Sequence, residues 1–228
     1  MYDFSKQKEM LDVTIDLLEQ NDLLECSSLG GGTALAAYYF NHRYSTDIDI
    51  FIYDTTNKTH LLKPSSWNTL INKKFEKIGF TGNFRHNDIY TEIVINQDSK
   101  IQFFDVIKKS KEPYKKVNLW GHNLNIDSIE EIIAKKIHYR GDIGNSRDLF
   151  DIAITILNIS NTPELKDLYS YEIKLMKPNN KYEFLAVNTI PYLKNILENI
   201  CASYEINYEL SNDEFILIEN EIYNDLKI

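Results

Sequence analysis

Residues 46–53 read TDIDIFIY, in which isoleucine occupies every second position from 48 to 52 and aspartate occupies positions 47 and 49. A period of two places successive side chains on opposite faces of a β-strand, so this segment is predicted to be a strand. One face would carry the apolar side chains of Ile48, Ile50 and Ile52. Asp47 and Asp49 would project together from the other face. The fold must therefore accommodate two neighbouring carboxylates on a strand whose other side packs on a core.

The rest of the first half predicts further helices and strands around this one. Apolar residues at helical spacing occupy three segments, residues 4–24, 33–40 and 65–78. Two strand-like runs, residues 88–95 and 100–107, are separated by the turn sequence NQDS and predict a hairpin.

From Asp127 the pattern is helical to the end of the chain, and Ser128 with Glu131 predicts a capping box for the first of these helices. The predicted fold class is therefore α+β. We expect a small mixed-sheet α/β core over residues 1–125 and a helical bundle over residues 126–228.

Three consecutive glycines, at positions 30–32, precede the predicted helix that begins near Thr33. Glycines let backbone N–H groups approach a ligand closely, and a helix N-terminus favours anions. With the hydroxyl of Thr33 beside them, they form a candidate cradle for phosphate. The alternative is a tight turn without a ligand.

The two aspartates indicate a metal site. Neighbouring carboxylates repel one another unless a cation lies between them. Mg²⁺ suits such oxygen ligands and commonly reaches substrate phosphates at the same time. Asp47 and Asp49 are therefore candidate metal ligands, and the alternative is the solvated polar face of an edge strand.

Asp105 is the candidate for a third metal carboxylate. In KIQFFDVI it falls in phase with Ile101, Phe103 and Ile107, on a face expected to be apolar. An acid in such a row is costly unless it is paired or bound to a metal. The alternative is a carboxylate at the strand end that reaches solvent.

Two blocks of the chain resemble a known family. GGTALAAYYFNHRYSTDIDIF and, further on, IIAKKIHYRGDIGNSRDLFDIA are similar to the signatures of AbiEii/AbiGii-type nucleotidyltransferases, which include the mycobacterial MenT enzymes. The resemblance implies a polymerase-β-like nucleotidyltransferase core and a toxin of a bacterial toxin–antitoxin or phage-defence system. It also implies that a triphosphate binds at Gly31, Gly32 and Thr33 and that Asp47 and Asp49 hold the metal. The downstream residues that match the family are Lys136 and Asp148.

Helix geometry favours Lys136 independently of the family. On a helical wheel Lys136 and Arg140 fall within an apolar stripe of isoleucines, whereas Lys135 falls outside it. Inward-facing cations favour an anion such as a triphosphate, although long side chains can also extend their charged ends to water.

Other charged residues near these blocks have simpler alternatives. Asp148 can instead stabilise a helix start, and Arg147 can pair with Asp151. Arg43 is a candidate phosphate contact or a cap on the sheet.

Charge and composition bound the partners. Residues 108–116, KKSKEPYKK, hold five lysines and one glutamate, which suits an RNA backbone or a solvated loop at a sheet edge. The net charge of −9 argues against a protein coated in basic surface for nucleic acid. No apolar stretch is long enough for a membrane span, no leader is visible and there are only two cysteines, so a cytoplasmic protein is expected.

The predicted activity is Mg²⁺-dependent transfer of a nucleoside monophosphate from an NTP to an acceptor, with release of pyrophosphate. The MenT resemblance suggests the 3′ end of a tRNA as acceptor and a cognate antitoxin as partner. Three alternatives remain: an antibiotic-type small-molecule nucleotidyltransferase, a catalytically silent partner-binding protein with the same fold, and a nucleic-acid-binding protein.

Overall fold

The computed structural model describes residues 2–53, 58–140, 151 and 155. The chain divides into two compact units, residues 1–128 and residues 129–228. In the described part of the chain, no helix combines the length and the apolar character that crossing a membrane requires.

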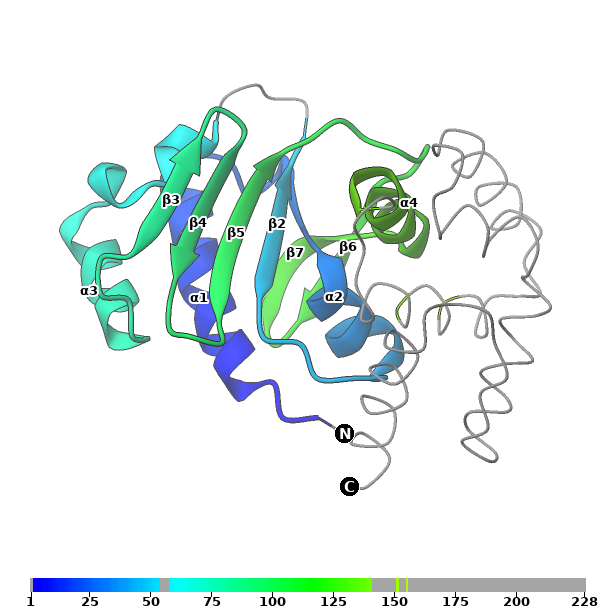
Figure 1. Cartoon of the computed structure of the whole chain (residues 1–228), viewed down its shortest axis with the longest axis horizontal. Helices are drawn as coiled ribbons and strands as arrows, with labels where there is room; N and C mark the ends of the chain where they lie inside the picture. The colour runs from blue at the N-terminus through cyan, green and yellow to red at the C-terminus, as the bar shows by residue number, and fades with distance from the viewer. Residues whose placement is uncertain (1, 54–57, 141–150, 152–154, 156–228) are drawn as a thin grey trace. The chain divides into compact units, whose positions relative to one another are not determined.

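The first unit contains helices and a sheet (Figure 1). Its helical segments are α1 (Ser5–Gln20), α2 (Gly31–Ala34), the π-helical η1 (Leu35–Phe40), the 3₁₀ turns η2 (Thr59–Leu62) and η3 (Pro64–Ser66), and α3 (Thr69–Lys77). Its strands are β1 (Ser27–Gly30), β2 (Ile48–Ile52), β3 (Phe84–Asn87), β4 (Tyr90–Val94), β5 (Lys100–Asp105), β6 (Tyr114–Leu119) and β7 (His122–Asp127).

The seven strands form one sheet in the order β3-β4-β5-β2-β1-β7-β6. The β2–β5 and β1–β7 pairs are parallel and the other pairs are antiparallel, so the sheet is mixed and the predicted α+β class is confirmed. The predicted hairpin is confirmed as β4 and β5. Strands β1, β3, β6 and β7 were not predicted. β1 has only four residues, β3 is exposed along its length and YKKVNL lacks a clear apolar alternation. HNLNID does alternate, so the signal for β7 was present in the sequence.

In the second unit α4 spans Ile129–Arg140, where a helix was predicted. Most of the predicted helical bundle beyond it lies outside the described residues.

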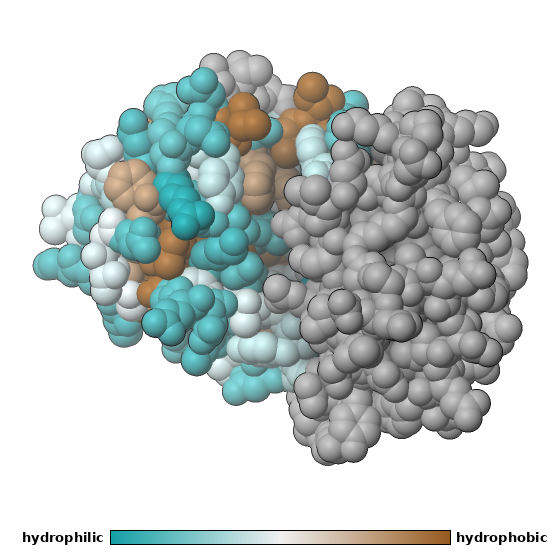
Figure 2. Space-filling model, viewed as in Figure 1, coloured by the Kyte–Doolittle hydropathy of each residue, from teal (hydrophilic) through white to brown (hydrophobic). Residues whose placement is uncertain are grey.

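One face of the sheet forms the core of the first unit. The three isoleucines of β2 are at most 1% exposed, as the alternation in residues 46–53 predicts. Helices α1 and α3 contact each other and α1 contacts β2; Figure 1 shows α1 behind β4 and β5. Trp67 stacks on Phe75 of α3 with ring centroids 4.0 Å apart. The coloured surface turned toward the viewer in Figure 2 is largely hydrophilic, with small apolar patches, as expected when apolar side chains gather inside.

Asp105 belongs to the apolar face. Its register partner on β2 is Ile52, whereas Asp49 pairs with Gln102, and partners on adjacent strands share a face. The Oδ2 atom of Asp105 accepts hydrogen bonds from the backbone N–H of Lys58 at 3.0 Å and of Thr59 at 3.4 Å. The structure therefore does not bring Asp105 together with Asp47 and Asp49. The carboxylate instead holds the chain where it enters η2.

Replacing Asp105 with alanine should lower stability without affecting metal binding. The substitution leaves two backbone donors near η2 without their acceptor, which costs about 1–3 kcal/mol. Thermal unfolding with and without Mg²⁺ and nucleotide measures both effects. If the variant is as stable as the wild type and its melting temperature no longer rises with Mg²⁺ and nucleotide, Asp105 is a metal ligand after all.

Candidate active site

The glycine turn lies directly against Asp49. β1 and β2 are paired so that Gly30 stands opposite Asp49, and the chain then turns into α2 at Gly31 with a φ of +65°. A Cβ at Gly31 would lie 2.0 Å from Oδ2 of Asp49. Only glycine satisfies both the backbone conformation and this close approach. The turn and the carboxylate therefore form one unit of structure.

Arg43 packs against the next glycine of the turn. Its side chain is 6% exposed, and Nη2 lies 2.1 Å from the position that a Cβ of Gly32 would occupy. Nη1 donates a hydrogen bond to the carbonyl oxygen of Tyr44 at 3.0 Å. A buried guanidinium thus sits beside the backbone of the turn, and its positive charge favours an anion there.

Thr33 holds the turn to the start of β2. It is 1% exposed, its hydroxyl donates to the carbonyl oxygen of Asp47, and it lies 2.9 Å from the hydroxyl of Ser45. The sequence suggested this hydroxyl as a phosphate contact. In the structure it is engaged by the protein's own backbone, and it positions the residue that carries the first carboxylate.

Asp47 and Asp49 are both half-buried, and Asp47 immediately precedes β2. Oδ1 of Asp47 accepts a hydrogen bond from the backbone N–H of Lys100, the first residue of β5, at 3.2 Å. Among the described residues, no group of three or more His, Cys, Asp or Glu side chains is arranged to hold a metal ion. Two partly exposed carboxylates beside a glycine turn suit Mg²⁺, which takes part of its coordination from water and phosphate oxygens.

A polar row crosses the same face of the sheet beside Asp49. On β5 its register partner is Gln102, and the partner of Gln102 on β4 is Glu92, which is 4% exposed. Nε2 of Gln102 donates to Glu92 at 2.9 Å, and the Tyr90 hydroxyl makes a short hydrogen bond to Glu92. Sequence analysis singled out none of these residues. The signal was available in the β4–β5 hairpin, which aligns Glu92 with Gln102.

Glu92 is kept ionised despite its burial. Burial opposes ionisation, but hydrogen bonds from Tyr90 and Lys100, and the positive charges of Lys100 and Arg85, hold the pKa of Glu92 below its usual value. Burial and the hydrogen bond to Glu92 raise the pKa of Tyr90 well above its usual range. Tyr90 therefore stays protonated as a donor. The Glu92 carboxylate is paired with Lys100 at 3.2 Å and Arg85 at 3.5 Å, so the cluster adds no net negative charge beside Asp49.

A second buried carboxylate lies on the other side of the turn. Asp127, at the end of β7, is fully buried and accepts hydrogen bonds from the hydroxyls of Ser28 and, at 2.8 Å, Tyr53. Its Oδ2 lies 2.4 Å from the position of a Cβ at Gly30. Gly30 is thus required for close packing. The sequence predicted Asp127 only as the start of a helical region.

In the second unit, Lys136 is paired with an acid from the second family-like block. Nζ of Lys136 lies 3.0 Å from Oδ2 of Asp151, and the two side chains are 10% and 0% exposed. Asp148 lies outside the described residues.

The prediction that Lys135 faces solvent is wrong. Lys135 is 4% exposed, with Nζ 3.6 Å from Oε1 of the fully buried Glu131. Residues 131–135 of α4 are buried in succession, and a wheel cannot separate an inner from an outer face on such a helix.

Solved structures of known proteins share the fold of this chain. ANT(2″)-Ia in complex with adenylyl-2″-tobramycin shares 13% identity at a TM-score of 0.53, covering 75% of this chain and 99% of that one. A solution structure of ANT(2″)-Ia gives 13% identity and a TM-score of 0.52, with coverage of 72% and 90%. MenT4, a nucleotidyltransferase toxin from Mycobacterium tuberculosis, is 13% identical at a TM-score of 0.42, with coverage of 96% and 86%, too weak a likeness to support an argument. No curated protein matches.

The family assignment comes from the sequence of most of the chain. Residues 16–174, more than half of its length, match the family described as nucleotidyl transferase AbiEii toxin, type IV TA system. This span includes the glycine turn, both aspartates, Lys136 and Asp151. The chain is a nucleotidyltransferase and belongs to the AbiEii toxin family.

Proposed function

We propose that this enzyme transfers a nucleoside monophosphate from an NTP to the 3′ end of an RNA, a tRNA in particular, in a Mg²⁺-dependent reaction. The observation that carries the proposal is the contact between the Gly31 backbone and the Asp49 carboxylate, with Asp47 two residues before it. At this contact a hard cation could bind to the carboxylates while a phosphate binds next to it at the backbone of the turn.

Asp47 and Asp49 would hold Mg²⁺, with the remaining coordination from triphosphate oxygens and water. The ion, when bound, would neutralise charge on the phosphates and lower the barrier to attack at phosphorus. The backbone of Gly31 and Gly32 would hold the triphosphate, and the buried Arg43 guanidinium beside the turn would add positive charge. The acceptor hydroxyl would attack the α-phosphorus as the bond to pyrophosphate breaks and the hydroxyl proton is released.

Lys136 is proposed as a further triphosphate ligand. Its pairing with the buried Asp151 restricts the ammonium to one orientation, which is how a positioned cation differs from a mobile surface lysine. Asp148 is proposed to act with it, on the family resemblance alone.

The toxin family supports an RNA acceptor and a cognate antitoxin that restrains the enzyme in a cytoplasmic setting. A second candidate is transfer to a small molecule, which the shared fold of ANT(2″)-Ia supports. Incubation with Mg²⁺, each labelled NTP and either total RNA or an aminoglycoside separates the two. Label in RNA alone supports the proposal, and label in the aminoglycoside alone would establish the second candidate.

Replacing Asp49 with asparagine should reduce nucleotide transfer more than about a hundredfold, because a metal ligand is worth several kcal/mol in the transition state. Stability should be unchanged or slightly higher, since one of two neighbouring charges is removed. Asp98→Asn, at an exposed position between β4 and β5, is the matched control and should be fully active. Full activity in Asp49→Asn would disprove the metal assignment.

Gly31→Ala should weaken Mg²⁺–NTP binding at least about tenfold, because the new methyl group displaces the Asp49 carboxylate. Gly82→Ala is the control: Gly82 also has a positive φ, +96°, so alanine is strained there too, but nothing lies within 4 Å of the added Cβ. Calorimetric titration of both variants with Mg²⁺–NTP separates the displacement of Asp49 from backbone strain. Equal NTP affinity in the two variants would mean that the glycines only make a turn.

Lys136→Ala should raise the KM for NTP about tenfold to a hundredfold, the scale of a charged hydrogen bond to phosphate. Lys135→Ala should mainly lower the melting temperature, because it removes the cation beside buried Glu131. Steady-state kinetics and thermal unfolding on both variants test this. If the KM for NTP rises more in Lys135→Ala than in Lys136→Ala, Lys135 is the triphosphate ligand instead.

A further inference from the structure

One row of residues crosses the sheet through Asp49. Each member is the register partner of the next, from β3 through β4, β5 and β2 to β1: Arg85, Glu92, Gln102, Asp49 and Gly30. Register partners on adjacent strands share a face, and Figure 1 shows β3, β4, β5 and β2 side by side. At about 4.8 Å per strand, the row extends roughly 14 Å from Asp49 to Arg85.

The in-line geometry of nucleotide transfer assigns each substrate to one side of Asp49. The attacking and leaving oxygens lie on opposite sides of the phosphorus. The glycine turn, which is the proposed triphosphate site, lies on the β1 side of β2, where Gly30 stands opposite Asp49. Pyrophosphate leaves on that side. The acceptor hydroxyl therefore arrives from the other side, over β5 and β4.

Lys100 is the first residue of this acceptor side, which we define as the Asp49 face of β5, β4 and β3. Its backbone N–H donates to Oδ1 of Asp47 at 3.2 Å. It precedes Gln102 by two residues on β5, so its side chain shares the face of Asp49. Its Nζ lies 3.2 Å from Oε2 of Glu92, and its side chain is 37% exposed. An ammonium beside the carboxylate pair is thus held in place and is accessible to an anion.

The acceptor side carries an excess of positive charge. Nη1 of Arg85 lies 3.5 Å from Oε1 of Glu92, and the Arg85 side chain is 77% exposed. The two cations, Arg85 and Lys100, therefore share one carboxylate, and one positive charge is left uncompensated within the cluster. Because exposed ion pairs contribute little free energy, the guanidinium can turn toward another anion at small cost.

We infer that Lys100 and Arg85 bind neighbouring backbone phosphates at the 3′ end of the acceptor RNA, while Glu92 holds the two cations in position. Lys100, beside Asp47, contacts the phosphate nearer to the attacking hydroxyl, and Arg85 contacts the one further out. Contacts of this kind position a nucleic acid without reading its sequence. The inference rests on the proposed RNA acceptor and adds the surface over which the strand reaches the metal site.

The same charge distinguishes the two acceptor candidates. An aminoglycoside carries several ammonium groups, so Lys100 and Arg85 would repel it. An RNA strand carries one negative charge per nucleotide and is attracted to the same cations. Like charges brought together disfavour a partner and opposite charges favour it, so the acceptor side is suited to the polyanion.

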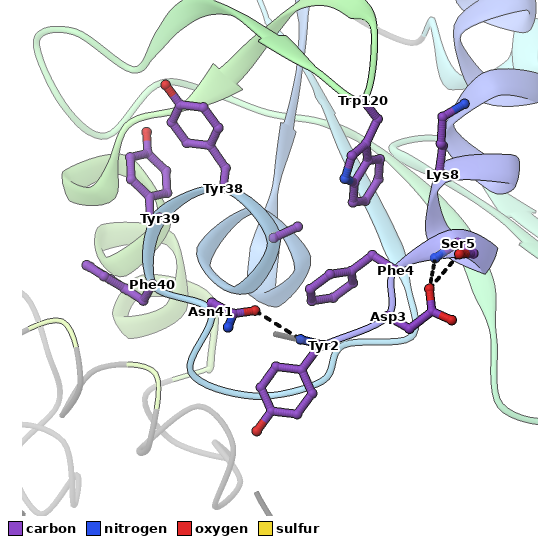
Figure 3. A pocket seen from close by; sticks show the side chains of 11 residues that line it. Tyr2, Asp3, Phe4, Ser5, Lys8, Tyr38, Tyr39, Phe40, Asn41 and Trp120 are labelled. Atoms are coloured by element: carbon purple, nitrogen blue, oxygen red, sulfur yellow. Dashed lines mark hydrogen bonds between the residues drawn. The ribbon is translucent and has the colours of Figure 1, made fainter. Parts of the chain in front are cut away.

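The aromatic pocket in Figure 3 lies elsewhere in the first unit. One of its walls is the turn between β6 and β7, on the β1 side of β2 in the order of the sheet. Figure 3 shows the rings of Tyr38, Tyr39 and Phe40 projecting from η1 away from Phe4 and Trp120. These rings do not surround a common ligand, and the pocket is not on the side from which the acceptor arrives.

Steady-state nucleotide transfer by the full-length protein tests the inference, with total tRNA as acceptor, labelled NTP and Mg²⁺. Lys100→Gln should raise the KM for tRNA about tenfold, the scale of a charged hydrogen bond to phosphate. Arg85→Gln, at the more exposed position, should raise it about threefold. The KM for NTP should not change, because the backbone N–H of residue 100 still holds Asp47 in both variants. Lys100→Arg keeps the charge and should recover most of the affinity for tRNA.

Lys73→Gln is the matched control, since it removes the same charge from an exposed position on α3. It should leave both KM values unchanged. The salt dependence of tRNA binding, followed by fluorescence anisotropy without NTP, gives a second readout. Each lost phosphate contact should lower the slope of log K against log salt by roughly 0.7, a change that a purely structural defect would not produce.

The outcomes separate this inference from the proposed function. If the wild type labels tRNA and Lys100→Gln keeps the wild-type KM for tRNA, the inference is wrong and the RNA acceptor stands. The inference is also wrong if Lys73→Gln weakens tRNA binding equally, or if the KM for NTP rises instead. If the wild type neither binds nor labels RNA, both are wrong. Should Lys100→Gln fail to fold, Arg85→Gln decides in the same way, because its side chain is 77% exposed.

Discussion

The site in the first unit depends on the packing of Gly31 against the Asp49 carboxylate. It requires the β1–β2 pairing that places Gly30 opposite Asp49, and it requires the absence of a side chain at the turn. Once this contact is made, Arg43 fits beside Gly32, and the Thr33 hydroxyl reaches the backbone of Asp47. The consequence is a rigid group in which a turn suited to phosphate and a pair suited to a metal cannot move independently.

The two faces of the sheet divide stability from chemistry. The apolar face carries the isoleucines of β2 and packs with α1 and α3, and there the carboxylate of Asp105 is used to hold backbone. The polar face carries Asp49 with Gln102 and Glu92 beside it. A shift of one residue along β5 decides between these environments, because the side-chain period of a strand is two. Buried Glu92, with its pKa held down by hydrogen bonds and neighbouring cations, stays charged on the polar face.

The chain also uses buried charge in the second unit, where Lys135 pairs with Glu131 and Lys136 with Asp151. Buried ion pairs contribute little net stability, since desolvation offsets their attraction, but they restrict the orientation of each charged group. Lys136, the proposed triphosphate ligand, is held in this way by its contact with Asp151.

The local sequence determined the strand of residues 46–53, the glycine turn, the β4–β5 hairpin and the α+β class, because each of these arises from short-range periodicity or from the properties of glycine. It also carried the two family-like blocks. The phase of Asp105 with Ile101 and Phe103 already indicated the apolar face, but only the tertiary structure decided that this carboxylate binds the backbone before η2, that Lys135 is buried and that Asp127 lies against Gly30. These outcomes depend on contacts between segments distant in sequence and on burial around a whole helix. Both are set by the packing of the folded chain, which spacing within one segment does not encode.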